Sequence, residues 1–467
     1  MKHLPILRAG RPYRSLTRQT LTDIRNGAPV AEVSQANGGL IARDLLGSAA
    51  RQKTLAALDM ATLIDACARA ADLFLEAELP LDEASGTTQT RDDFLADQSA
   101  TTGLPRVLCE RNMEKIATAL RLMPDILRGL SRGVDLDRVT RDYRREADAL
   151  GAILPSNSPG VHSLWVPALA MKVPVVLKPG AQEPWTPMRI AQAMISAGFP
   201  AEAFGFYPTD HTGAGEILMR CQRALFFGDA RTVDAWRGEG RIQIHGPGWS
   251  KMVLDGQAVD RRESHMDVLV DAIAANGGRS CVNASAVWVP RDGKALADDL
   301  ARRLAEIQAR PLDDGAAQLA AFANPKLAEL LDQRIEAQLA EGGAEDMTAK
   351  YRKGPRLVTC DGCTFLLPTL IWCERADHPL AKAEYLFPFA AVCEVPESEM
   401  AARLGPTLTL SLVSERRDLI EAMLDCRHID RINIGAIPTN RVRWDQPHEG
   451  NLFELLYKRR AVQREPV

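Results

Sequence analysis

The stretch VVLKPG at residues 175–180 decides the fold, because it is a short apolar run that stops at a lysine, a proline and a glycine. A helical pattern follows at residues 186–198, and another apolar run follows at residues 203–207. Short apolar runs that alternate with helices are typical of βαβ units in a parallel sheet. The stretch therefore predicts an α/β fold.

The same alternation extends in both directions along the chain. We expect further strands at residues 151–155, 224–227, 241–244 and 252–254, and further helices at residues 163–171, 213–220 and 230–237. Ligands of doubly wound parallel sheets bind outside the carboxyl ends of the strands. A nucleotide site is therefore expected at this edge of the sheet.

A second α/β unit is predicted further along the chain, and a mostly helical region at residues 40–133 precedes the first unit. The second unit comprises strands at 284–289, 365–372, 390–395 and 408–413 and helices at 294–309 and 325–341. We expect a Rossmann-like cofactor domain at residues 1–255, with a charged bridging ribbon near 135–150, an α/β catalytic domain at 256–435 and a C-terminal segment at 436–467.

The composition points to small-molecule chemistry. The chain has 467 residues, 46% hydrophobic and 25% charged, as in a soluble globular protein, and its net charge of −4 offers no attraction for nucleic acid or an anionic membrane. The N-terminal residues resemble no signal peptide, and no apolar run is long enough to span a membrane. We expect a cytoplasmic protein with neither type of partner.

The nine cysteines indicate reduced thiols, because their number is odd and they are spread over a long chain. The CDGC stretch at residues 360–363 has the CxxC spacing, but no second pair accompanies it. A structural zinc needs four ligands, whereas Asp-Gly between apolar flanks is typical of a hairpin turn. We therefore expect a turn there and no metal.

A candidate nucleophile stands in NGGRSC at residues 276–281, between a helical pattern and an apolar run. Glycines beside a thiol let a ligand approach closely, so the thiolate of Cys281 can attack a carbonyl while nearby N–H groups hold the oxyanion. The alternative is a buried cysteine that acts as a small hydrophobic residue.

Three strand ends carry further candidates. In LPSNSP at residues 154–159, Asn157 can donate its carboxamide to an oxyanion or cap the next helix. Lys178 can reach a ribose or a phosphate, or remain solvated. In FFGDAR at residues 226–231, Gly228 and Asp229 close a strand and open a helix, which is the geometry that directs free N–H groups toward a pyrophosphate.

In this order, the segments resemble the aldehyde dehydrogenase superfamily from about residue 145 to residue 395. PSNSP at 155–159 is similar to its Pro-Trp-Asn-x-Pro motif, KP at 178–179 to its Lys-Pro strand end, and NGGRSC to its Asn-x-Gly-Gln-x-Cys motif. AGFP at residues 197–200 also matches a recurrent helix end of the family.

The resemblance implies an oxidoreductase that uses NAD or NADP. Cys281 would form a thiohemiacetal with an aldehyde, with Asn157 and the backbone N–H of Cys281 holding the oxyanion, and hydride transfer would leave an acyl thioester. Lys178 would contact the adenosine ribose, in a cofactor site with Ser156, Gly228 and Asp229. The resemblance also implies a homodimer or homotetramer, with the C-terminal segment returning to the interface.

One departure concerns the thioester. Hydrolytic members use the glutamate of Glu-Leu-Gly-Gly for deacylation, whereas residues 244–250 read IHGPGWS. One alignment puts His245 near the glutamate's place as a general base, and the other puts Ile244 there. Members that exchange acyl groups with coenzyme A commonly lack this glutamate, and the stretch resembles the fatty acyl-CoA reductase branch. We therefore favour acyl-CoA reduction or acylating aldehyde dehydrogenation slightly over plain hydrolytic oxidation. A non-catalytic binding or assembly relative is the third alternative.

The second departure concerns the cofactor. Many NAD-preferring relatives carry a glutamate three residues after the lysine, where this chain has Ala181, and its absence permits NADP. Gln182 or Glu183 would restore a polar or acidic partner if the register slipped. EYLFP at residues 384–388 resembles Glu-x-Phe-Gly-Pro, which implies that Glu384 binds the nicotinamide ribose, although an ordinary surface carboxylate is the alternative.

The family's Pro-Phe-Gly-Gly near the C-terminus has no counterpart in this chain. A divergent segment that contains Arg441, Trp444, Asp445 and His448 stands in its place, and it either lines the substrate mouth or forms an irregular surface loop.

Overall fold

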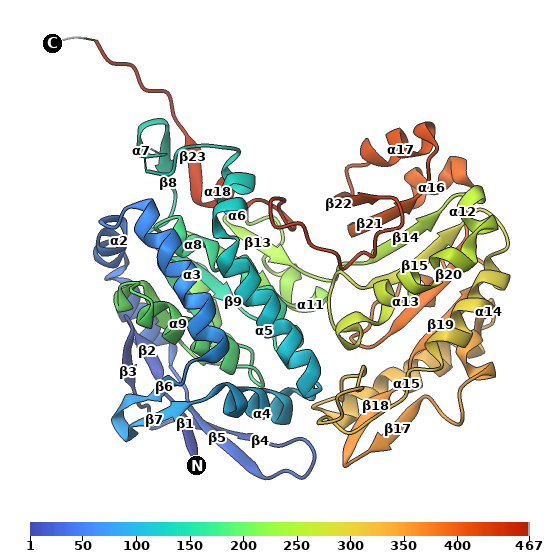
Figure 1. The fold of residues 1–467 in the computed structure, drawn as a ribbon, viewed down its shortest axis with the longest axis horizontal. Helices are drawn as coiled ribbons and strands as arrows, with labels where there is room; N and C mark the ends of the chain where they lie inside the picture. The colour runs from blue at the N-terminus through green and yellow to red at the C-terminus, as the bar shows by residue number, and fades with distance from the viewer. Residues whose placement is uncertain (138, 466–467) are drawn as a thin grey trace.

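The computed structural model describes residues 1–137 and 139–465, which form two lobes side by side (Figure 1). Within these residues, the first lobe is built on a seven-stranded sheet of order β13-β12-β9-β10-β11-β2-β3. Strands β9 to β13 are parallel to one another, whereas β2 pairs antiparallel with β11 and with β3 at one edge. The bounds are β2 (Ile6–Arg8), β3 (Arg11–Tyr13), β9 (Leu150–Ile153), β10 (Val175–Lys178), β11 (Phe204–Phe206), β12 (Arg223–Phe227) and β13 (Ile242–His245).

Helices cover both faces of this sheet, which explains why its strands are apolar on both sides. Val175 and Leu177 belong to the core that includes α3 (Met60–Glu76), α5 (Arg106–Arg121) and α9 (Trp185–Ser196). Val176, between them, belongs to the opposite core with α1 (Gly38–Leu45) and α10 (His211–Arg220). The run VVLKPG therefore forms the predicted buried strand, and the predicted α/β class is confirmed.

The helical prediction for residues 40–133 holds for most of that region. Besides α1, α3 and α5, it contains α2 (Ser48–Ala56), α4 (Arg91–Thr102) and α6 (Met123–Ser131). A hairpin of β6 (Leu79–Asp82) and β7 (Thr87–Gln89) interrupts the helices, turning at Gly86 with φ +67°. A three-stranded sheet of β1 (Lys2–Leu4), β5 (Pro29–Ser34) and β4 (Arg18–Thr22) precedes them. Neither was predicted, because such short strands carry too few residues to show an alternating pattern.

The second lobe contains a seven-stranded sheet of order β16-β19-β20-β15-β14-β21-β22, in which all neighbours but β16 and β19 pair in parallel. Its strands are β14 (Ser250–Leu254), β15 (Ala284–Val289), β16 (Ala344–Asp346), β19 (Thr369–Cys373), β20 (Phe389–Glu394), β21 (Thr407–Val413) and β22 (Ile429–Ile434). Its longer helices are α13 (Met266–Ala274), α14 (Gly293–Leu304), α15 (Pro325–Ala340), α16 (Glu397–Arg403) and α17 (Arg417–Leu424).

Two predicted elements are divided in the structure, and a proline explains the first. The strand expected at residues 365–372 is divided into β18 (Cys363–Leu366) and β19, because Pro368 between them has no N–H for a ladder. The helix expected at residues 163–171 is a 3₁₀ turn, η2 (Pro159–Leu164), followed by the short α8 (Pro167–Ala170). The turn predicted at Cys360–Cys363 is confirmed, because it joins β17 (Leu357–Cys360) to β18 and both thiols are free.

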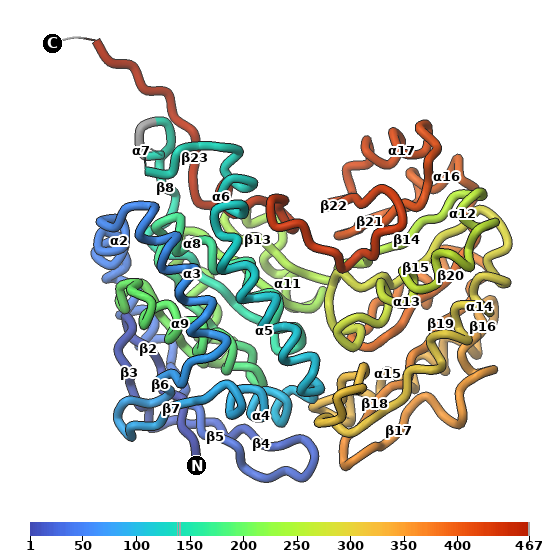
Figure 2. Tube along the Cα trace, in the orientation of Figure 1, coloured from blue at the N-terminus to red at the C-terminus, as the bar shows by residue number. Residues whose placement is uncertain are grey.

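The chain crosses between the two sheets at residues 246–249, because β13 belongs to the first sheet and β14 to the second. This crossing lies one strand before the boundary proposed near residue 255. After β22 the chain returns to the first lobe, through α18 (Leu452–Leu456) to β23 (Tyr457–Arg459), as the red tube in Figure 2 shows. There β23 pairs with β8 (Tyr143–Arg145) of the expected ribbon, of which Arg138 lies outside the described residues.

None of the described helices combines the length and the apolar character that a membrane crossing requires.

Candidate active site

The predicted site residues of the first lobe gather at one edge of its sheet. The chain passes from β9 to β10 and β11 on one side of β9, and β12 and β13 lie on its other side, so the strand order reverses between β9 and β12. Asn157 follows β9, Lys178 ends β10, Gly228 follows β12 and His245 ends β13. This is the crevice at which doubly wound sheets bind their ligands.

The loop that carries Cys281 requires its glycines. After α13, Asn276, Gly277 and Gly278 all have left-handed backbone, with φ of 53°, 65° and 70°. A Cβ on Gly278 would lie 2.3 Å from the carbonyl carbon of Phe387 and 2.3 Å from the nitrogen of Pro388. The loop therefore packs directly on the backbone before β20, and this contact determines where the thiol lies.

Hydrogen bonds tie this loop to the loop after β9. The Asn157 carboxamide donates to the carbonyl of Arg279 at 2.7 Å, and the hydroxyls of Ser158 and Ser280 lie 3.2 Å apart. The Asn276 carboxamide donates to Ser280 Oγ at 3.2 Å. The structure thus brings Asn157 and Cys281 into one loop pair, although no sequence spacing connects them.

Cys281 lines a cavity of about 100 Å³ between the lobes. Apolar side chains from α6, η2 and β12 line part of it, among them Ile126, Leu130, Val161, Leu164 and Leu225. The polar groups in its wall include Lys115, His245, Arg431, His448 and Glu449. Of the divergent C-terminal residues, Trp444 and His448 line this cavity within the described chain, whereas Arg441 and Asp445 do not.

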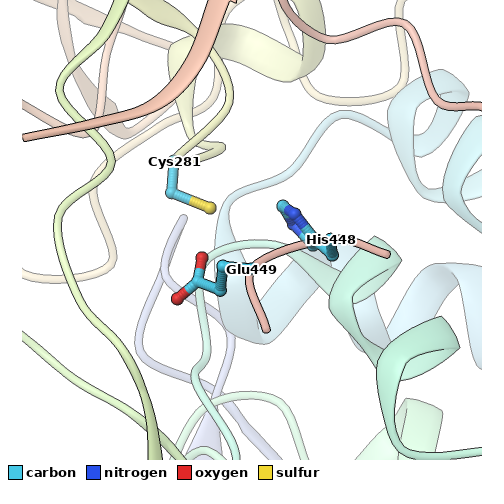
Figure 3. A group of neighbouring side chains, drawn as sticks. All are labelled: Cys281, His448 and Glu449. Carbon is cyan, nitrogen blue, oxygen red and sulfur yellow. The ribbon is translucent and has the colours of Figure 1, made fainter. Parts of the chain in front are cut away.

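Glu449 is the functional candidate that the sequence analysis missed. Figure 3 shows Cys281, His448 and Glu449 facing one space. The Cys281 sulfur, a ring nitrogen of His448 and a carboxylate oxygen of Glu449 lie within 4.8 Å of one another. Glu449 Oε1 is also 3.0 Å from His245 Nδ1, and the His245 ring stacks on Phe227 with 4.2 Å between ring centres. The only sequence signal was an acidic residue next to His448 in an irregular segment.

The resting thiol of Cys281 is neutral. Burial raises its pKa well above the usual range, the carboxylates of Glu449 and Glu384 act in the same direction, and the ammonium of Lys115 opposes them. Burial lowers the pKa of His448 well below 6.5, and the cations Arg431 and Lys115 act in the same direction. The thiol therefore has a neutral imidazole and a carboxylate beside it as proton acceptors.

Glu384 lies on the other side of the Cys281 loop. Its carboxylate accepts the N–H of Gly248 at 3.1 Å and that of Trp249, and burial raises its pKa to about 7. Gly248 in turn packs on Cys281, because a Cβ there would lie 2.0 Å from the Cys281 carbonyl oxygen. Glu384 is thus a half-buried carboxylate at the lobe crossing that is held by two backbone N–H groups.

The other cofactor candidates lie at the strand ends of the first lobe. Lys178 is half-buried, and burial lowers its pKa. Ser156 Oγ accepts the N–H of Gln182 at 3.2 Å, and a Cβ on Gly180 would lie 2.3 Å from that oxygen. Asp229 caps α11 (Ala230–Asp234) by accepting the N–H of Thr232 at 2.9 Å. A Cβ on Gly228 would lie 2.5 Å from Thr232 Oγ1.

Glu183 does not take over the role of the cofactor-binding glutamate that many relatives carry at the position of Ala181. It is buried, accepts hydrogen bonds from Thr186 and Gln98, and lies 3.1 Å from His162 Nε2. Its carboxylate therefore serves the core of the first lobe, and the side chain of Ala181 is exposed at the strand end.

The sequence matches the model of the aldehyde dehydrogenase family over residues 80–414. Hydroxyisobutyraldehyde dehydrogenase of Mycolicibacterium austroafricanum is 25% identical over 235 residues, which are 48% of this chain and 45% of that protein. Aldehyde dehydrogenase citD of Monascus ruber is 28% identical over 304 residues, 62% of this chain and 58% of that protein. The chain thus spans about half the length of the curated relatives it matches.

Solved structures resemble the whole fold. Aldehyde dehydrogenase KauB of Pseudomonas aeruginosa has a TM-score of 0.80 at 17% identity, covering 99% of this chain and 96% of that one. An indole-3-acetaldehyde dehydrogenase, solved with NAD+, has a TM-score of 0.79 at 18% identity, covering 98% and 96%. These likenesses establish the fold and agree with the family match.

Proposed function

The chain belongs to the aldehyde dehydrogenase family, and on that premise we propose that it oxidises an aldehyde with NAD or NADP through a thioester on Cys281. The observation that carries the proposal is the arrangement of Cys281, His448 and Glu449, whose sulfur, ring nitrogen and carboxylate oxygen lie within 4.8 Å of one another. A nucleophile with two proton acceptors beside it is what covalent catalysis at a carbonyl requires.

Acylation begins with the transfer of the thiol proton to the carboxylate of Glu449. The thiolate then attacks the aldehyde carbon, a C–S bond forms and negative charge develops on oxygen. The backbone N–H of Cys281 and the carboxamide of Asn157 supply the oxyanion donors. The Asn157 nitrogen carries two hydrogens and donates one to the Arg279 carbonyl, so a second hydrogen remains for the oxyanion.

The nicotinamide cofactor supplies the hydride acceptor when it is bound. Lys178 and the loops that contain Ser156 and Gly228 would hold its adenosine and phosphates, and Glu384 would hold the nicotinamide ribose. The first-lobe residues fit such a group, because they share the crevice at the strand-order reversal and the half-buried Lys178 has no ion-pair partner within the described chain. Exposed Ala181 and buried Glu183 leave no acid there to repel a 2′-phosphate, which is compatible with NADP.

We favour hydrolysis of the thioester over transfer to coenzyme A. The preference for acyl-CoA chemistry rested on the missing glutamate before Gly246, and Glu449 supplies a carboxylate from the C-terminal segment instead. After releasing the thiol proton to solvent, Glu449 takes a proton from water, the water oxygen attacks the acyl carbon and the thiolate of Cys281 leaves. His245 orients Glu449 across 3.0 Å. The curated relatives carry the names of aldehyde dehydrogenases and give the acyl-CoA branch no support.

The test is to incubate the chain with NAD+ or NADP+ and a panel of aldehydes, and to follow reduced cofactor and free acid with and without coenzyme A. Hydrolytic oxidation yields equal amounts of acid and reduced cofactor without coenzyme A. A strict requirement for coenzyme A would instead establish the acylating reaction, and an absence of turnover with every aldehyde would favour the non-catalytic relative. The homodimer or homotetramer stays a prediction, which sedimentation velocity would test.

A further inference from the structure

Two cations line the substrate cavity without an acidic partner. Lys115 lies on α5 and Arg431 on β22, and both contribute to the wall that contains Cys281. No carboxylate within the described chain lies at ion-pair distance from either side chain. Within the described chain, the one side-chain hydrogen bond of Arg431 is a 3.3 Å contact to the carbonyl of Arg441. By contrast, Arg443 pairs with Asp445 at 3.0 Å, and Glu449 Oε1 lies 3.0 Å from His245 Nδ1.

Such an arrangement is costly in a folded protein, because a cation withdrawn from water needs a compensating anion. Burial lowers the pKa of Lys115 and of Arg431, and a thiolate at Cys281 is close enough to both side chains to act in the opposite direction. The two cations also act on each other, since Arg431 lowers the pKa of Lys115 further. They therefore surround the same space as the nucleophile.

Thiol activation does not account for this pair of cations. The pKa of Cys281 stays well above its usual range although Lys115 is close enough to lower it. The two cations therefore do not produce a resting thiolate. They remain available to a ligand that enters the cavity.

The surrounding residues hold the Lys115 amine open to the cavity. A Cβ on Gly160 would lie 3.3 Å from Lys115 Nζ, so the glycine leaves room for the ammonium. Asn112, one helical turn before Lys115, accepts the Gly160 N–H at 3.1 Å and fixes this contact. The neighbouring wall of Leu130, Val161 and Leu164 is apolar and offers the ammonium no other partner.

We propose that Lys115 and Arg431 form a carboxylate-binding subsite, and that the preferred substrate is a short aldehyde with a carboxylate at its other end. The inference rests on the proposed aldehyde oxidation and specifies its substrate class. An arginine and a lysine together match a carboxylate well, because the guanidinium binds both oxygens and the ammonium adds a point charge. The chain between the two functional groups must be short, because the cavity has only about 100 Å³.

The experiment compares kcat/KM for 4-oxobutanoate with kcat/KM for its methyl ester, which has the same aldehyde and no charge. We expect the acid to be preferred at least tenfold by the wild type. The acid-to-ester ratio should fall at least tenfold in Lys115→Met and in Arg431→Met, with partial recovery in Arg431→Lys. Exposed Lys53 and Arg427 provide the matched controls, Lys53→Met and Arg427→Met, which should keep the wild-type ratio. General damage to the fold lowers both rates and leaves the ratio unchanged.

A wild-type ratio near one, or ratios in Lys115→Met and Arg431→Met equal to the wild type's, would overturn the subsite while leaving aldehyde oxidation in place. If no aldehyde is turned over, the proposed function fails, and calorimetric titration with butanedioate still decides the subsite. Binding of this unreactive diacid to the wild type and not to Lys115→Met would support the subsite. Absence of binding to the wild type would overturn it.

Discussion

The two halves of the candidate site were placed by different means. The Cys281 loop and the loop after β9 lie next to regular strands. They contain glycines and prolines, whose backbone conformations depend mainly on the neighbouring residues in the sequence. The segment at residues 436–451, which delivers His448 and Glu449, crosses from one lobe to the other without regular structure. Sequence motifs predict the two loops of the first half. The position of His448 and Glu449 depends instead on how a long irregular segment packs in the folded protein. The proposed function requires both halves, and each can be perturbed separately.

The largest effect is expected in the half that the motifs predict. Cys281→Ala removes the nucleophile, so aldehyde-dependent formation of reduced cofactor should fall at least about a thousandfold. Cys360→Ala is the matched control, because that thiol lies in the β17–β18 turn away from the cavity. Steady-state absorbance at 340 nm measures both. Turnover in Cys281→Ala near that of the wild type would refute the thioester mechanism.

The next effect tests the crossing segment. Glu449→Gln removes a general base, so steady-state turnover should fall about 100- to 1,000-fold. Since the thiol also loses one of its two proton acceptors and keeps His448, the rapid first turnover should slow as well, but by less. Stopped-flow measurement separates the two phases. Glu454→Gln, an exposed carboxylate on α18, is the control. An unchanged deacylation rate in Glu449→Gln would show that Glu449 is not the base. Either His245 would then activate the water, or the acyl group would be transferred to coenzyme A.

A third prediction concerns the packing that positions the thiol. Gly278→Ala introduces a Cβ 2.3 Å from the Phe387 backbone at φ +70°, so unfolding free energy should drop by about 2–4 kcal/mol. Gly315→Ala is the matched control, because a Cβ there has no neighbour within 4 Å. Urea denaturation followed by circular dichroism compares them. Equal midpoints for the two variants would contradict the close packing of this loop.

A smaller, pH-dependent effect is expected at the lobe crossing. The pKa of Glu384 is raised from 4.5 to about 7, so the folded state holds the proton more tightly than the unfolded chain does. This contribution to stability is fully present below the unfolded pKa and is lost as pH rises toward 7. The wild type should therefore lose stability relative to Glu384→Gln between pH 4.5 and 7. Urea midpoints measured at pH 5 and pH 8 check this sign, and a constant difference would exclude it.

The smallest expected difference lies between the two cofactors. Exposed Ala181 and buried Glu183 leave no acid against a 2′-phosphate, so NADPH should bind at least as tightly as NADH. Side-by-side fluorescence titrations measure the two affinities. A clear preference for NADH would contradict the prediction, and Ala181→Glu should in any case weaken NADPH binding selectively.

The strand ends and the Cys281 loop could be read from the sequence because each depends on near neighbours. Apolar runs set the strands of both large sheets, and the NGGRSC stretch marks a tight loop before β15. Glu384 was also found, through a motif that resembled the family's. The small N-terminal sheet and the β6–β7 hairpin were not predicted, because most of their strands are short and carry little periodicity. Strands β13 and β14 were both predicted, but the pattern of a strand does not show which sheet it joins, so the lobe crossing was placed one strand too late.

By itself, the sequence determined the α/β class and the family, and it predicted Cys281 as the nucleophile, since these follow from local patterns and motif order. Only the tertiary structure decided that Glu449 reaches Cys281, that Glu183 is buried away from the cofactor crevice, and that Lys115 and Arg431 face one cavity. These residues lie far apart along the chain. Their proximity results from the packing of two lobes and a returning segment, which no local pattern specifies.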